Sequence, residues 1–274
     1  MSTIKVIGQK SRTLQERFDA LSKMIPASDD VITWVMDDAL SLDELMAIAN
    51  QANILALPVS LIQSAAHFDQ LKAAIDTAGD VKWVNPLAHA PHFHALSKQL
   101  IAAGFKDKAI NRLTLYKHNG GQTNTLTQEL LSLYMWLDTT MSPIESITAV
   151  KRDKANRTVI VLSVKHEQGT ITNVQIIYSD AADFVELEVT GERGMLVQRS
   201  DSECGAVVLS QGKSTVLDSV ATKMNAQNLW YALHEKAPHQ ANEVSINTAL
   251  AVVRATETSL ISQQSVAVKG GNIV

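Results

Sequence analysis

The hydrophobic positions of the first hundred residues switch repeatedly between two periodicities. Short apolar runs rich in β-branched residues predict four buried strands. They lie at residues 4–7, 31–36, 54–57 and 81–84. After each run, apolar residues recur at helical spacing, at residues 14–24, 42–51, 67–78 and 92–103. Ser41 and Glu44 form a capping box at the second of these helices. Strand and helix in turn, four times over, predict a parallel sheet with right-handed crossovers.

The pattern changes after about residue 110, where strand-like segments dominate. Six are predicted, at residues 112–118, 147–152, 158–167, 170–178, 184–190 and 195–199. Turn signals at residues 167–169 and 191–194 join neighbouring segments, which favours antiparallel pairing. Further elements are predicted as helices at 127–137, 221–235 and 246–261, and as a short strand at 265–268. We therefore expect a small α/β domain over residues 1–110 and an α+β domain over residues 111–274.

Composition narrows the class of protein without naming a function. The chain has 274 residues, 46% hydrophobic and 19% charged, which is typical of a globular protein. A net charge of −4 and 5% aromatic residues argue against nucleic-acid binding. No apolar stretch approaches the roughly 18 residues that cross a bilayer, so no membrane partner is expected. Cys204 is the only cysteine, which excludes an internal disulfide, and with no signal peptide we expect a cytoplasmic protein.

Three stretches carry a resemblance to a known family. They are DDVITWVMDDALSLDELMAIANQANILALPVSL at 29–61, GDVKWVNPLAHAPHFHALSKQLIAAGF at 79–105 and GGQTNTLTQELLSLYMWLDTTMSPIESITAV at 120–150. In their order they resemble the Gfo/Idh/MocA family of NAD(P)-dependent sugar and polyol oxidoreductases. The resemblance implies a truncated Rossmann-like parallel sheet, followed by a domain of the substrate and oligomerisation type with a large, mainly antiparallel open sheet.

This sequence departs from the family's pattern at the dinucleotide-binding turn. The family holds its cofactor on a Gly-x-Gly-x-x-Gly turn, whose glycines let main chain approach the pyrophosphate. Only Gly8 matches, while Lys10 and Thr13 stand where glycines belong. We interpret residues 4–7 as the family's second strand, with the whole glycine-bearing unit missing. The expectation is no cofactor, with NAD or NADP as the alternative.

The lysine of the family's Glu-Lys-Pro motif is also missing. The aligned residues are Ala56, Leu57 and Pro58, and leucine neither donates a hydrogen bond nor transfers a proton. If the alignment shifts to the next strand, the position falls on Asn85, which forms hydrogen bonds but is no acid or base at neutral pH.

The family's aspartate and histidine on the helix after Gly-Gly fall on Thr125 and Glu129. A spacing of four places both side chains on one helix face. A buried Glu129 with a raised pKa would serve as a base. We favour the plainer interpretation, in which Glu129 is an acid at the helix start that suits the helix dipole.

Three histidines, His89, His92 and His94, lie within six residues. Such a cluster is a candidate zinc site, but Pro91 interrupts it and no acidic or cysteine ligand is near in sequence. The resemblance brings this segment to the substrate cleft, so we favour a ligand contact by His89 or His92 over a metal. The predicted cleft is lined by Leu57, Pro58, Asn85, His89, His92 and Thr125, with Glu129 as the candidate catalytic residue.

The departures favour a motif-degenerate, non-catalytic member of the family. It would bind a sugar-like ligand, or pair through the open sheet with a second copy, as a homodimer, or with an active paralogue. Alternation over residues 159–166 predicts a strongly apolar face on that sheet. The main alternative is a divergent NAD(P)-dependent oxidoreductase acting on a sugar or polyol-like substrate, with Glu129 or a histidine as base. A third is a lyase or isomerase that moves protons without a cofactor.

Overall fold

The computed structural model divides into two units, each assembled from segments distant in sequence. Unit 1 comprises Met1–Ala90, Thr125–Met135 and Lys223–Asn247, and unit 2 comprises Pro91–Asn124, Trp136–Thr222 and Thr248–Val274. The described residues are 3–7, 16, 19, 31–35, 41–89, 93, 97, 100, 109–118, 126–154, 157–180, 184–192, 194–199, 207–210, 213–216, 240–269 and 272–273. The division of the chain at residue 110 stays a prediction.

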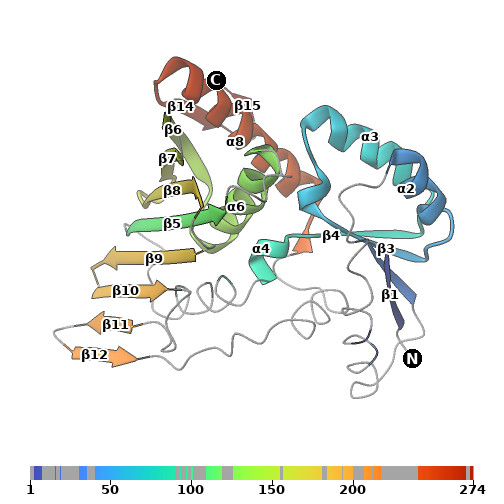
Figure 1. Cartoon of the computed structure of the whole chain (residues 1–274), viewed down its shortest axis with the longest axis horizontal. Coiled ribbons are helices and arrows are strands. Elements are labelled where there is room, and N and C mark those ends of the chain that lie inside the picture. The colour runs from blue at the N-terminus through green and yellow to red at the C-terminus, as the bar shows by residue number, and fades with distance from the viewer. Residues whose placement is uncertain are drawn as a thin grey trace. The chain divides into compact units, whose positions relative to one another are not determined.

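Unit 1 is built on a sheet whose first four strands run parallel (Figure 1). The strands are β1 (Thr3–Ile7), β2 (Val31–Val35), β3 (Ile54–Pro58), β4 (Asp80–Val84) and β13 (Gln240–Ala241), paired in that order. The parallel pairing of β1 to β4 confirms the sequence-based expectation. The last strand, β13, pairs antiparallel with β4 and was not predicted.

The helices of unit 1 are α2 (Leu42–Ala49), the 3-10 turn η1 (Val59–Leu61), α3 (Ala65–Ile75) and α4 (Pro86–His89). Helix α2 begins at the capping box that the sequence predicts, and α3 begins two residues earlier than predicted, after Ser64. Ser41 and Glu44 form the predicted capping box, with Glu44 Oε2 accepting from the Ser41 main-chain N–H at 2.8 Å. Because the strand order advances one place at each right-handed crossover, α2 and α3 lie on the same face of the sheet, and Figure 1 shows them side by side. Phe68 of α3 meets Trp83 of β4 edge to face, with ring centroids 5.4 Å apart.

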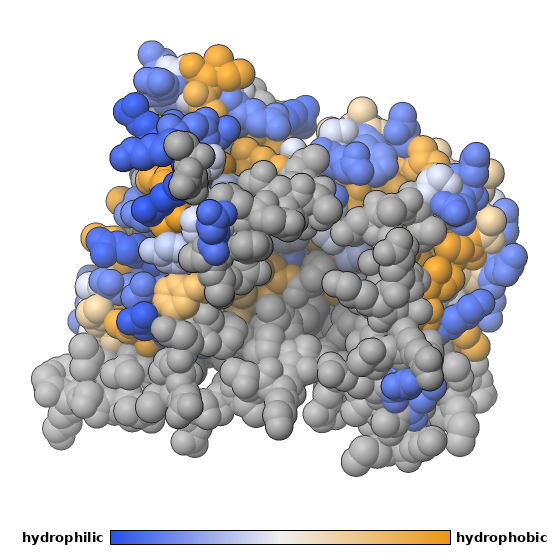
Figure 2. Space-filling model, viewed as in Figure 1, coloured by the Kyte–Doolittle hydropathy of each residue, from blue (hydrophilic) through white to orange (hydrophobic). Residues whose placement is uncertain are grey.

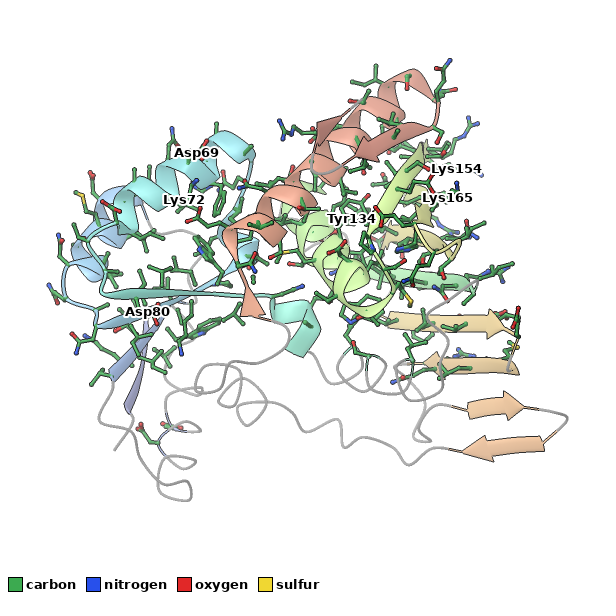
Figure 3. All side chains as sticks on the ribbon, turned by 180° about the vertical axis from the view of Figure 1, so that it is seen from behind. Asp69, Lys72, Asp80, Tyr134, Lys154 and Lys165 are labelled. Atoms are coloured by element: carbon green, nitrogen blue, oxygen red, sulfur yellow. The ribbon has the colours of Figure 1, made fainter. Side chains whose placement is uncertain are left out.

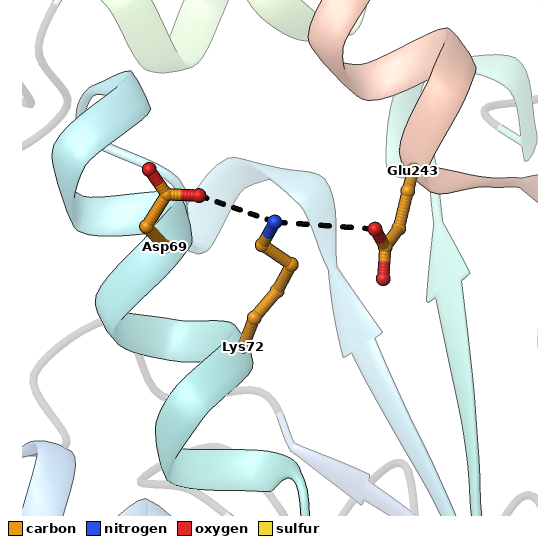
Figure 4. A network of polar contacts seen from close by, with 3 residues as sticks. All are labelled: Asp69, Lys72 and Glu243. Carbon is orange, nitrogen blue, oxygen red and sulfur yellow. Dashed lines mark ion pairs between the residues drawn. The ribbon is translucent and has the colours of Figure 1, made fainter.

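One ion-pair network joins α3 to the start of α8 (Glu243–Ser262). Lys72 Nζ lies 3.1 Å from Asp69 Oδ1 and 3.9 Å from Glu243 Oε2. Figure 3 labels Asp69 and Lys72 on α3, and Figure 4 shows the lysine between its two carboxylates. All three side chains reach solvent, so we assign the network about 0–1 kcal/mol and a role in positioning α8.

The strand order corrects one interpretation of the sequence. In the doubly wound order 3-2-1-4-5-6, the first strand is followed across the sheet by the fourth, fifth and sixth, while the second lies on its other side. The run β1-β2-β3-β4 matches the 1-4-5-6 part of that order. Residues 4–7 therefore occupy the place of the first strand, and their interpretation as the second strand is wrong. Gly8, Lys10 and Thr13, which follow β1, lie outside the described residues.

Unit 2 is built on a ten-stranded sheet that is antiparallel except for one pair. Its strands are β5 (Ile110–His118), β6 (Ile144–Lys154), β7 (Arg157–His166), β8 (Ile171–Ser179), β9 (Phe184–Gly191), β10 (Gly194–Arg199), β11 (Val207–Ser210), β12 (Lys213–Val216), β14 (Val266–Lys269) and β15 (Asn272–Ile273). Their order is β12-β11-β10-β9-β5-β8-β7-β6-β14-β15. The large, mainly antiparallel sheet confirms the expected fold class. The parallel pairing of β5 with β8, and the short strands β11, β12 and β15, were not predicted.

One face of this sheet is buried within the unit. Along β7, Ile160, Leu162 and Val164 are at most 2% exposed. Helix α8 packs on that side, where Ser259 Oγ accepts a hydrogen bond from the main-chain N–H of Ala149 at 2.9 Å. The strongly apolar face that the sequence predicts is thus covered inside the chain.

The opposite face, which we call the open face, carries the alternate residues of the same strands. Val161, Ser163 and Lys165 of β7 are exposed there. Figure 2 shows hydrophilic side chains gathered, with hydrophobic ones between them, at the end of the molecule where Figure 1 draws β6, β7 and β14. Within the described segments, no helix has the length and apolar character needed to cross a membrane.

Candidate functional site

The carboxyl ends of β3 and β4 meet helix α6 (Leu126–Thr140) in unit 1. Asn85, directly after β4, donates from Nδ2 to the main-chain oxygen of Ser132 at 2.8 Å. Gln128 of α6 donates from Nε2 to the main-chain oxygen of Ser60, just beyond β3, at 2.6 Å. Open α/β sheets bind ligands beyond the carboxyl ends of their strands. This junction is therefore the candidate site.

Asn85 is engaged at both ends of its side chain. Besides its bond to Ser132, its Oδ1 accepts from the main-chain N–H of Leu87 at 3.1 Å, in the first turn of α4. The residue is 2% exposed. The amide thus connects β4, α4 and α6, and its place in a ligand cleft stays a prediction.

Leu57, the residue that the resemblance aligns with the family lysine, is fully enclosed. Its exposed fraction is 0%, and Pro58 beside it is also buried. In the sheet Leu57 pairs with Trp83 of β4. A leucine at this depth fills the core and offers no group for proton transfer.

Glu129 lies in the first turn of α6 and is half-buried. A carboxylate in a first helical turn is favoured by the helix dipole. This placement agrees with the plainer interpretation of Glu129 as an acid at the helix start. Its role as a base stays a prediction, and Thr125, its expected partner four residues earlier, lies outside the described residues.

The histidine segment is described only in part. His89 is the last residue of α4, but its side chain is outside the described part of the structure, as are His92 and His94. Among the residues that the structure does describe, no group of three or more His, Cys, Asp or Glu side chains is arranged to hold a metal ion. Ligand contacts by His89 and His92 stay predictions.

One buried network of polar side chains, which lies in unit 2, was not predicted. His166 is 0% exposed; its Nδ1 lies 2.6 Å from the main-chain oxygen of Ser142 and its Nε2 lies 3.1 Å from Thr172 Oγ1. Asn111 Nδ2 in turn donates to Thr172 Oγ1 at 3.1 Å. A neutral imidazole with its proton on Nδ1 donates to the Ser142 oxygen and accepts from the Thr172 hydroxyl at Nε2, so both ring nitrogens have a partner. Burial lowers the pKa of His166, although its bond to Ser142 opposes the shift.

Asp138, near the end of α6, has a raised pKa, whereas the pKa of His166 is lowered. Burial raises the pKa of Asp138, and the nearby carboxylate of Glu167 raises it further, while a hydrogen bond from the main chain of Ile144 opposes both. These groups adjoin the α6–β6 connection rather than the junction at Asn85. The signal available in the sequence was a lone histidine in an otherwise alternating strand, and it reads equally well as a surface residue.

Known proteins match this chain by structure. Neither a protein-family model nor a curated protein sequence matches it. A levoglucosan dehydrogenase in its apo form has a TM-score of 0.66 at 11% identity, over 97% of this chain and 89% of that one. An NAD binding oxidoreductase from Klebsiella pneumoniae has a TM-score of 0.67 at 12% identity, over 98% and 99%. A biliverdin reductase from Synechocystis sp., in complex with biliverdin and NADP+, has a TM-score of 0.63 at 11% identity, over 94% and 98%.

These neighbours are Gfo/Idh/MocA-type NAD(P)-dependent oxidoreductases. This chain has their two-domain fold, a Rossmann-like parallel sheet joined to a large, mostly antiparallel one. Identities this low establish the fold and leave the activity to be argued from the site.

Two described features do not fit a dinucleotide with hydride-transfer chemistry. A dinucleotide in a doubly wound sheet lies at the point where the strand order reverses. Within the described strands, β1 to β4 advance in one direction and provide no reversal. Leu57 is the second feature, because the resemblance aligns this buried hydrocarbon side chain with the family's lysine.

Proposed function

We propose that this chain is an oxidoreductase-like protein that does not transfer hydride and acts instead as an oligomer partner, with a sugar-like small molecule as its candidate ligand. The observation that carries the proposal is the complete burial of Leu57 at the lysine position. The bonds of Asn85 to Ser132 and Leu87 support it, because they occupy both polar atoms of a buried side chain at the end of β4. The single cysteine supports a cytoplasmic location.

The open face of unit 2 supports the oligomer-partner role. It exposes three large apolar side chains, Ile110 at 57% and Val161 and Ile171 at 38% each. Apolar residues exposed together on a sheet face are suited to contact with another protein. The partner that requires no further component is a second copy of the chain, and an active paralogue is the alternative.

The second candidate function is a divergent NAD(P)-dependent oxidoreductase acting on a sugar or polyol-like substrate. The fold it shares with NAD(P)-dependent enzymes favours this function. Glu129, on the helix that adjoins the carboxyl ends of β3 and β4, is then the candidate base.

Binding measurements separate the two functions. NADH and NADPH are titrated separately into the full chain, with heat of binding and tryptophan fluorescence as readouts. The proposal expects no saturation up to about 1 mM, the upper end of ordinary enzyme–substrate affinities. Saturable binding at micromolar concentration, to either nucleotide, retires the proposal in favour of the oxidoreductase. Sedimentation velocity on the same sample tests the partner role, for which a concentration-dependent dimer is expected.

A further inference from the structure

Three cationic side chains lie together at the end of the β6–β7 hairpin. Lys154 pairs directly with Arg157, and Arg152 pairs with Val159 one step along the strands. Alternate residues of a strand share a face, and cross-strand partners do as well. Arg152, Lys154 and Arg157 therefore lie on the same side as Val161, which is the open face. We call these three residues the cationic corner; Figure 3 labels one of them, Lys154, together with Lys165 of the neighbouring strand.

The cationic corner has no counter-charge within the described part of the chain. All three side chains are exposed, and none of them takes part in an ion pair with a described residue. The carboxylate of Asp153, on the other side of the hairpin, is engaged by Lys151 at 3.2 Å and by the Thr158 hydroxyl at 2.7 Å. Like charges directly opposite each other, as Lys154 and Arg157 are, destabilise a strand pair. An uncompensated corner of this kind on a chain of net charge −4 points to a negatively charged partner.

The same face carries carboxylates on another strand. In β9, Leu187 and Val189 are buried, so Glu186 and Glu188 point to the open face. Their cross-strand partners on β5 are Thr114 and Arg112. Glu188 lies 3.9 Å from Arg112, while Glu186 has no ion pair among the described residues. We call Glu186 and Glu188 the acidic strip; β5, β8 and β7 separate it from β6, the strand of Arg152 and Lys154.

We propose that two copies of the chain pack through their open faces with the cationic corner of each over the acidic strip of the other. This inference rests on the proposed pairing and adds to it the residues that fix its register. A two-fold axis that lies midway between the faces, perpendicular to the line from corner to strip, exchanges the two clusters. Both contacts then form at once, as a self-complementary interface requires. Val161, Ile171 and Ile110, exposed on the same face, supply the apolar contact.

Charge complementarity selects this occupant over other anionic partners. A second copy brings an identical face, so that each cationic corner meets an acidic strip, whereas nucleic acid or an anionic membrane offers no cations to Glu186 and Glu188. Opposed clusters of this kind set the register and the rate of association more than the affinity, and like charges brought together suppress pairing.

The experiment is a charge exchange read out by sedimentation velocity. One variant reverses the corner, Arg152→Glu with Arg157→Glu, and the other reverses the strip, Glu186→Lys with Glu188→Lys. Each alone is expected to weaken self-association at least about tenfold, because it sets like charges face to face. An equal mixture of the two is expected to restore a heterodimer close to wild-type affinity, since both contacts are again opposite in charge. Circular dichroism confirms that each variant is folded.

Lys151→Glu is the matched control, because it reverses a charge at the same hairpin end on the other face and is expected to leave association unchanged. A wild-type chain that stays monomeric overturns the pairing itself. A dimer that resists both reversals, and also about 1 M salt, where the screening length falls to about 3 Å, overturns only the register proposed here. A mixture of the two folded variants that fails to form a heterodimer also overturns the proposed register. A neutral pair, Glu186→Gln with Glu188→Gln, replaces the strip reversal if that variant does not fold, and is expected to weaken association less than reversal.

Discussion

Asn85 and Ser132 join the end of strand β4 to helix α6. The asparagine amide donates to the serine main-chain oxygen at 2.8 Å, and its own oxygen accepts from Leu87 at 3.1 Å. Ser132 also belongs to the helix that carries Glu129. The side chain at the strand end therefore links strand β4 to the helix.

Replacing Asn85 by alanine is expected to destabilise the protein by about 1–3 kcal/mol. The substitution removes the Leu87 N–H's partner and the bond that the Ser132 oxygen accepts beyond its helical one, at a side chain that is 2% exposed. An unpaired buried polar group costs energy of this order. Urea unfolding measures the change. Gln51→Ala, at an exposed turn, is the control and is expected to stay within about 0.5 kcal/mol of wild type. Unchanged stability of the Asn85 variant contradicts its role in linking β4 to α6.

Leu57→Lys tests whether the position that the resemblance aligns with the family's lysine is closed. At 0% exposure a lysine ammonium has neither water nor a built partner, and we expect a loss of about 3–5 kcal/mol, in the range found for an uncompensated buried charge. The free energy of unfolding is measured at pH 7. An open, solvated site would accept the lysine at little cost.

Leu57→Met is the matched control, because it keeps the volume and the apolar character of the side chain. We expect it to cost less than about 1.5 kcal/mol. If the lysine variant is as stable as the methionine variant, the site is open, and the proposed non-catalytic role loses its main support.

The sequence predicts the local elements well and the long-range pairing poorly. The runs at 31–36 and 81–84 are strands because a continuous apolar stretch suits a sheet covered on both faces, and the structure confirms both. The parallel pairing of β5 with β8 joins strands about fifty residues apart, with two other strands between them in sequence. Turn signals between neighbours say nothing about such a partner.

At the candidate site, too, the sequence predicts local features but not long-range contacts. Glu129 could be placed in a first helical turn from sequence, because capping and dipole effects are local. The burial of Leu57 and the engagement of Asn85 depend on which helix covers the strand ends. That covering comes from α6, about fifty residues further along the chain from Asn85.

Stability is expected to fall in weak acid because of His166. Burial lowers the pKa of the folded imidazole below its ordinary value of 6.5, so the unfolded chain binds the proton more readily. The stabilising contribution of the neutral ring is complete above about pH 6.5 and is lost as pH falls through the folded value. Each pKa unit of difference corresponds to about 1.4 kcal/mol. Urea unfolding between pH 8 and pH 5 measures the slope.

His166→Gln separates this histidine from the other titrating groups. The amide still offers a donor and an acceptor in the buried network but does not titrate in this range. We expect the variant to be less stable than wild type at pH 8 and to lose less stability by pH 5. A variant with the wild-type slope assigns the acid sensitivity to other residues.

Asp138→Asn is expected to stabilise the protein at neutral pH, by about 0.3–1 kcal/mol. Burial and the carboxylate of Glu167 raise the pKa of Asp138 above 3.8, and a negative charge in the last turn of α6 also opposes the helix dipole. The protonated Asp138 stabilises the folded protein fully below about pH 3.8, and this stabilisation is lost as pH rises through the pKa of the folded state. The neutral His166 ring, by contrast, loses its stabilising contribution as pH falls. The asparagine oxygen still accepts the bond from Ile144, so the gain at pH 7 should vanish as the wild-type carboxyl becomes protonated in acid.

Asp180→Asn, at an exposed position, is the control and should show no such pH-dependent gain. A loss of stability at pH 7 in the Asp138 variant means that its carboxylate has a favourable partner stronger than the repulsion from Glu167.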